Sequence, residues 1–83
     1  MPLELTGTEF TLLEVLARKV GQPVPKDEIY QKVLGRNMQR YDRAIDVHVS
    51  AIRHKLVAQL DKTVAIESIR GVGYQLVIRT PID

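Results

Sequence analysis

The feature that most constrains the fold is an amphipathic pattern in the second half of the chain. Between residues 43 and 60, apolar side chains recur at three- and four-residue intervals, namely Ile45, Val49, Ile52, Leu56 and Leu60. At 100° per residue they fall on one narrow face of an α-helix, and Asp42 is a good residue to cap its start. The pattern predicts a long helix that packs this stripe into a core and leaves its reverse side in solvent.

The reverse side of this predicted helix is small, polar or cationic. It carries Arg43, Val47, Ser50, Ala51 and His54, flanked by His48, Arg53 and Lys55. A helix fits the major groove of DNA, where each base pair shows a distinguishable edge, if its outward side chains are not bulky and apolar. Arginine, histidine and serine can hydrogen-bond to bases, Val47 can meet a thymine methyl, and Arg53 and Lys55 are placed for phosphates.

Two further helices are predicted nearer the N-terminus. Thr6-Gly7-Thr8-Glu9 matches the S/T-x-x-E capping box and predicts a helix over residues 7–20. Its expected buried positions are Phe10, Leu13, Leu16, Ala17 and Val20. After a connection bracketed by two prolines, Lys26-Asp27-Glu28 predicts the start of a second helix. Its buried residues are expected to be Ile29, Tyr30, Val33 and Leu34.

Strands are expected at both ends of the chain. Leu3 and Leu5 alternate with Glu4 and indicate the end of a strand, whereas 64–69 and 74–78 are rich in strand formers. The intervening Arg70-Gly71-Val72-Gly73 has two glycines that allow positive φ, which predicts a hairpin with a cation at its tip. Such a wing can insert the Arg70 guanidinium into a narrow minor groove. The predicted fold is α+β: a winged helix-turn-helix of three helices with a C-terminal β-hairpin wing and a remnant N-terminal strand.

Composition limits the classes of protein that fit. Eighty-three residues make one domain at most, so 1–83 is expected to be a single effector domain. Apolar runs fall far short of the roughly 20 residues of a membrane span, and the start lacks a secretion signal, so we expect a cytoplasmic protein without membrane partners. Residues 36–83 carry eight basic and five acidic side chains, against four and five in 1–35. The second half is therefore the candidate anion-binding half.

The sequence offers no enzymatic constellation. Asp46, His48 and Ser50 are the residue types of a hydrolase triad, but at alternate positions of one helix they point in different directions. His48 and His54 lie six positions apart, unlike the i, i+4 pairs of helical metal sites, and cysteine is absent. We expect no catalysis, no metal and no cofactor.

Three motifs appear in order along the chain. They are Leu5-Thr6-x-x-Glu9-Phe10-x-Leu12-Leu13, then Asp42-Arg43-x-Ile45-Asp46-Val47-His48-Val49-Ser50-x-Ile52-Arg53-x-Lys55-Leu56, and Ile69-Arg70-Gly71-Val72-Gly73-Tyr74. In sequence and spacing, from about Leu3 to Val77, the chain resembles the OmpR/PhoB-type effector domain, the DNA-binding output half of bacterial two-component response regulators.

The resemblance implies a set of contacts and partners. The helix over 43–60 would be the recognition helix, with DNA contacts at Arg43, Val47, His48, Ser50, Ala51, Arg53 and, in the wing, Arg70. Lys55 and Tyr74 match positions on the phosphate side. The loop residues Arg36, Asn37, Met38, Gln39 and Arg40 match the segment through which relatives contact RNA polymerase. The resemblance also implies binding to tandem repeats in double-stranded DNA as head-to-tail homodimers once a receiver domain is phosphorylated, and so a role in transcription regulation.

Two departures from the family pattern bear on function. The chain starts at what resembles the last strand of the N-terminal sheet, so we expect the rest of that sheet and the receiver domain to be missing. The phosphorelay with a sensor kinase would need that receiver. Ser50-Ala51 stands where many members carry adjacent arginines, which removes cationic contacts. This leaves open an alternative, a winged helix that binds proteins and not DNA, which would lack the steep salt dependence of DNA binding.

Overall fold

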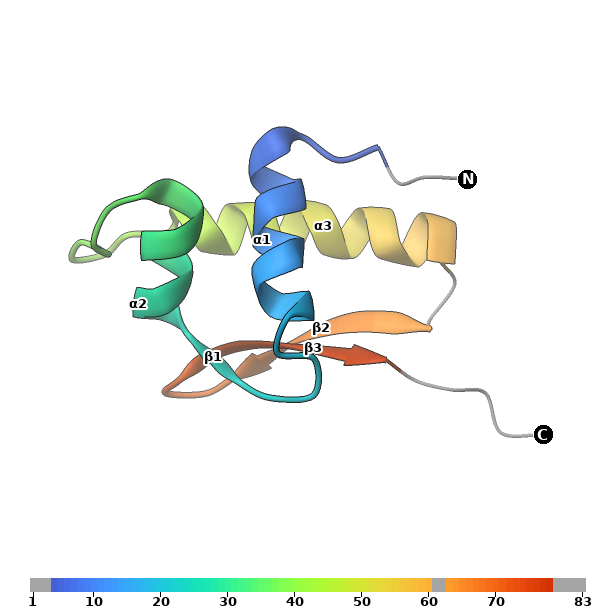
Figure 1. The fold of residues 1–83 in the computed structure, drawn as a ribbon. Helices are drawn as coiled ribbons and strands as arrows, with labels where there is room; N and C mark the ends of the chain where they lie inside the picture. Colours follow the sequence, from blue (N-terminus) through green and yellow to red (C-terminus); the bar gives the residue numbers. More distant parts are fainter. Residues whose placement is uncertain (1–3, 61–62, 79–83) are drawn as a thin grey trace.

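The computed structural model describes residues 4–60 and 63–78 (Figure 1). Its helices are α1 (Gly7–Ala17), α2 (Lys26–Ile29), which continues as the π-helical turn η1 (Tyr30–Leu34), and α3 (Ala44–Leu60). Its strands are β1 (Val24–Pro25), β2 (Val64–Ile69) and β3 (Gly73–Ile78), which form an antiparallel sheet in the order β1-β3-β2. The helices lie over one face of this sheet, and the β2-β3 hairpin forms the wing, so the predicted winged helix-turn-helix is confirmed.

The core lies between the helices and the sheet. Its buried apolar residues come from all of these elements: Leu12, Val15, Leu16, Val24, Ile29, Tyr30, Ile45, Val49, Ile52, Leu56, Ile66, Tyr74 and Leu76. The predicted stripe of α3 is confirmed at Ile45, Val49, Ile52 and Leu56, each at most 2% exposed. The side chain of Leu60 lies outside the described part of the chain.

The inward face of α1 differs from the predicted one. Leu16 is buried as predicted and Leu13 packs against the core, but the other buried residues are Glu9, Leu12 and Val15, whereas Phe10 is 60% exposed and Ala17 and Val20 also face solvent. The helix ends at Ala17, and residues 18–20 form a turn. Apolar residues lie around most of the circumference of α1. Periodicity alone therefore predicted a buried face that is rotated about the helix axis from the face that is buried in the structure.

The N-terminal half of the sheet also departs from the prediction. The segment between Pro23 and Pro25 was expected to be a connection, yet Val24 pairs with Tyr74 and Pro25 with Gly73. A proline is tolerated there because β1 is an edge strand. Residues 4–6 form no strand, so among the described residues the expected N-terminal strand is absent, and Leu3 lies outside them.

Glu9 couples α1 to α3. The predicted capping box is present: the Glu9 backbone N–H donates to Thr6 Oγ1 (3.2 Å), and the Glu9 carboxylate accepts from the Thr6 N–H (3.1 Å). The same carboxylate oxygen lies 2.5 Å from Lys55 Nζ. The Lys55 ammonium holds the pKa of Glu9 below its ordinary value, although burial opposes this shift.

We expect Glu9→Gln to lower the free energy of unfolding at neutral pH by about 1–2 kcal/mol, because the amide cannot form the ion pair with Lys55. Since the folded pKa of Glu9 lies below the unfolded one, the contribution of its charge is full above the unfolded pKa and is lost as pH falls through the folded pKa. Urea denaturation from pH 7 to pH 3 should therefore show a smaller acid loss in Glu9→Gln than in wild type. The exposed Glu14→Gln is the control, and equal acid sensitivity of Glu9→Gln and wild type would contradict the expectation.

Candidate nucleic-acid interface

The outer face of α3 is open to solvent over its whole described length. Arg43, Ser50 and His54 are exposed, Val47 is 64% exposed, and His48 and Ala51 are half-buried at the margins. The exposed ridge continues one turn beyond the predicted set, because Val57 is 65% exposed. The spacing of Val57, three residues after His54, could have identified it from the sequence.

The start of α3 is fixed by Asp42. Its Oδ1 accepts a hydrogen bond from the Ala44 N–H (3.1 Å), and its Oδ2 accepts from the Gln39 N–H (3.2 Å) and lies 2.5 Å from Arg36 Nη1. The Arg36 guanidinium holds the pKa of Asp42 well below its usual range. The Asp42 carboxylate thus binds the first amide of α3, as expected of a capping residue, but the helix begins at Ala44, one residue later than predicted, so Arg43 directly precedes it.

The loop before α3 is exposed along its predicted contact residues. Arg36 is paired with Asp42, and its guanidinium lies 5.4 Å from the Tyr30 ring centroid, whereas Asn37 Oδ1 accepts a hydrogen bond from Gln31 Nε2. Met38, Gln39 and Arg40 have exposed side chains. The structure thus leaves Met38 to Arg40 accessible and gives Arg36 a role in holding the loop to α3.

The wing is a tight hairpin with Arg70 at its tip. Ile69 pairs with Gly73, and the Val72 N–H donates to the Ile69 carbonyl (3.0 Å) across the turn. Gly71 has a φ of +80°, but Gly73 lies in β3 without positive φ, so the predicted role of this second glycine was wrong. Arg70 is exposed and makes no hydrogen bond or ion pair within residues 4–60 and 63–78.

Arg53 joins α3 to the wing. Its Nε donates to the Ile66 carbonyl (2.9 Å) and its Nη2 to Ser68 Oγ (3.0 Å), both on β2. Its guanidinium also lies 5.8 Å from the Tyr74 ring centroid. Arg53 therefore sets the position of β2 relative to the outer face of α3.

Asp46 provides a second link between α3 and the wing. The Tyr74 hydroxyl donates to its carboxylate, and Lys26 Nζ lies 3.1 Å from its Oδ1. Burial, reinforced by the Asp46 carboxylate, raises the pKa of Tyr74 to about 12. Burial of Asp46 opposes ionisation, but Tyr74 and Lys26 hold the pKa of this carboxyl below its usual value. Tyr74 is only 7% exposed, so most of this side chain serves the core.

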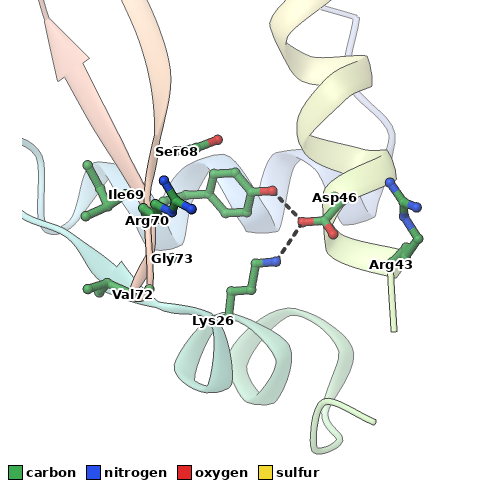
Figure 2. Close-up of a pocket in the computed structure, with 10 residues that line it drawn as sticks. Lys26, Arg43, Asp46, Ser68, Ile69, Arg70, Val72 and Gly73 are labelled. Carbon is green, nitrogen blue, oxygen red and sulfur yellow. Dashed lines mark hydrogen bonds and ion pairs between the residues drawn. The ribbon is translucent and has the colours of Figure 1, made fainter. Parts of the chain in front are cut away.

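A hollow of about 530 Å³ lies between the start of α3 and the wing (Figure 2). The hollow is lined by Lys26, Arg43 and Asp46 and by the segment from Ser68 to Tyr74, which includes Arg70. Because Arg43 and Arg70 line the same hollow, the start of the outer face of α3 and the tip of the wing are accessible from the same side of the molecule.

The described residues lack the features of two other kinds of site. Among them, no group of three His, Cys, Asp or Glu side chains is placed to hold a metal ion. None of the helices over these residues has the length and apolar character to cross a bilayer.

Comparison with known families and proteins points in one direction. Residues 1–76 match the family described as "Transcriptional regulatory protein, C terminal". The transcriptional regulatory protein CpxR of Escherichia coli is 48% identical over 75 residues, which are 90% of this chain and 32% of CpxR. The transcriptional activator protein PfeR of Pseudomonas aeruginosa is 39% identical over 77 residues, 93% of this chain and 25% of PfeR. The chain thus spans about a third or less of the length of these relatives.

Solved structures agree with these sequence matches. The DNA-binding domain of CpxR from E. coli superposes with a TM-score of 0.83 at 45% identity, covering 94% of this chain and 76% of that one. The Klebsiella pneumoniae RstA DNA-binding domain in complex with the RstA box gives a TM-score of 0.78 at 29% identity, covering 90% and 74%.

Proposed function

Since this chain belongs to the family of transcriptional regulatory protein C-terminal domains, the OmpR/PhoB-type effectors, we propose that it binds double-stranded DNA sequence-specifically and regulates transcription as the output domain of a response regulator. The observation that carries the proposal is the solvent-exposed outer face of α3, beside a wing whose Arg70 has no hydrogen bond or ion pair to any other described residue. RstA, one of the structural neighbours, has been solved with its DNA box.

The proposed contacts divide by groove. Arg43, Ser50 and His54 would hydrogen-bond to base edges in the major groove, and Val47 would meet a thymine methyl. Arg70 would enter the adjacent minor groove. His48 and Ala51 would lie at the margins of the contact.

The remaining predicted contacts have partners inside the protein. Arg53 is bound to β2, Lys55 to Glu9, and Tyr74 to Asp46. We assign these three residues first to holding the wing and α1 against α3. A phosphate contact would use the donors that these interactions leave free, such as the remaining N–H groups of Arg53.

The wider assembly is also a proposal. Head-to-tail homodimers on tandem repeats follow from the family assignment, as does contact with RNA polymerase through the loop 36–40. The exposed side chains of Met38, Gln39 and Arg40 support the latter. DNA recognition of this kind needs no catalysis, and Asp46, the acid of the triad-like residue set, is already bound to Lys26 and Tyr74.

The proposal is tested by selecting bound duplexes from random sequence with the wild-type chain and measuring their affinity for Arg43→Ala. We expect affinity to fall about 5- to 150-fold, equivalent to 1–3 kcal/mol for one base contact. Arg18→Ala, at an exposed position directly after α1, is the matched control and should bind like wild type. Wild-type affinity should also fall steeply as salt rises. A folded chain that selects no duplex would favour the protein-binding alternative.

A further inference from the structure

The hollow lies between α3 and the wing, the two elements that the proposed function places in neighbouring grooves of DNA. A major groove and its neighbouring minor groove are separated by a single sugar–phosphate strand, which carries one negative charge per nucleotide. If the outer face of α3 lies in the major groove and Arg70 in the adjacent minor groove, that strand must cross the hollow between them. The lining of the hollow then determines how the strand is held.

The lining is positively charged overall. Lys26, Arg43 and Arg70 contribute three cations, and Asp46 is the one carboxylate among the lining residues. Arg43 and Arg70 are already assigned to bases. Lys26 has no predicted contact with DNA, because it lies in the half of the chain without an excess of basic residues and outside the three family motifs.

Lys26 is held in place from two directions. Its backbone N–H donates to the Val72 carbonyl at the wing (3.0 Å), and its Nζ lies 3.1 Å from Asp46 Oδ1 on α3. The ammonium also lies 5.7 Å from the centroid of the Tyr74 ring, as part of the cluster drawn in Figure 2. A lysine that is already restrained loses less side-chain entropy when it binds a ligand.

The side chain of Lys26 still has binding capacity. An ammonium carries three N–H donors, and the contact with Asp46 uses one of them. The side chain is 32% exposed, and it lines the hollow. We propose that Lys26 donates to a backbone phosphate of the DNA strand that crosses this hollow, and that Asp46 is the residue that positions it. The inference rests on the proposed DNA binding and adds a contact that fixes the wing and α3 on the same strand.

The test is the salt dependence of DNA binding by Lys26→Gln, in which the amide can still hydrogen-bond to Asp46. The probes are the duplex selected by wild type and a shuffled duplex of equal length. Loss of one phosphate contact should lower the slope of log K against log salt by about 0.9. Because a phosphate contact carries no base information, affinity should fall by a similar factor on both duplexes. Lys26→Arg should restore the slope.

Lys32→Gln is the matched control, since Lys32 is also a lysine paired with an acid, Glu28 (2.9 Å), and does not line the hollow. It should leave the slope unchanged. If wild type binds but folded Lys26→Gln keeps the wild-type slope, or loses affinity on the selected duplex alone, Lys26 is not a phosphate contact. Should Lys26→Gln fail to fold, the double variant Lys26→Met, Asp46→Asn removes both charges of the pair, and its slope is compared with that of Asp46→Asn alone. Failure of wild type to bind either duplex would instead overturn the proposed function.

Discussion

Gly73→Ala is expected to lower the free energy of unfolding by about 3 kcal/mol or more. A Cβ at Gly73 would lie 2.1 Å from the Val24 carbonyl oxygen and 2.8 Å from the Lys26 nitrogen. Both atoms belong to the backbone, so no side-chain rotation can relieve the overlap. The strand β1 would have to leave β3, with loss of its pairing and of the hydrogen bond from Lys26 to Val72.

Gly71→Ala provides the matched comparison two residues away. Gly71 has a φ of +80°, but a Cβ there would meet no atom within 4 Å. The cost should be the left-handed strain alone, about 1–2 kcal/mol. Urea denaturation of the two variants measures the difference, and a loss in Gly73→Ala no larger than that in Gly71→Ala would show that β1 does not pack against Gly73 as described.

Ser50→Glu is expected to weaken duplex binding at least 100-fold and to leave stability nearly unchanged. Ser50 is exposed near the middle of the outer face of α3, so a carboxylate there would be pressed against a polyanion. Glutamate is a good helix former, which is why the fold should tolerate it. Fluorescence anisotropy with the selected duplex measures affinity, and thermal unfolding measures stability.

Ala17→Glu is the control for net charge. Ala17 is exposed on α1, so this substitution adds the same carboxylate away from the outer face of α3. Its effect should be limited to the general loss of attraction between the chain and DNA, well under tenfold. Comparable losses in the two variants would mean that the outer face of α3 has no special place in binding.

The parts of the fold that the sequence predicted are those with a one-sided pattern. In α3, apolar residues occupy a single face, so the stripe from Ile45 to Leu56 could be identified from periodicity. The hairpin and the capping box were predictable because they depend on residues close in sequence. In α1, Phe10 and Leu12 compete for the core, and only the packing of the other elements decides that Leu12 is buried.

What could not be predicted depends on contacts between distant residues. The sequence gives no sign that Lys55 pairs with Glu9, 46 residues away, or that Arg53 is bound by β2. The role of Gly73 was misread because a glycine needed for close backbone approach looks the same in sequence as one needed for positive φ. The position of Lys26 in the hollow also depends on residues far apart in sequence, because it follows from the pairing of β1 with β3.

The most direct test of the central claim is an NMR titration of the chain with the selected duplex, following every backbone amide at fixed salt. The largest shift changes are expected over residues 43–54 on α3 and 70–72 in the wing, with little change at Phe10 and Ala17 on the exposed side of α1. Strong changes on α1, with the amides of 43–54 unperturbed, would contradict recognition of DNA by the outer face of α3.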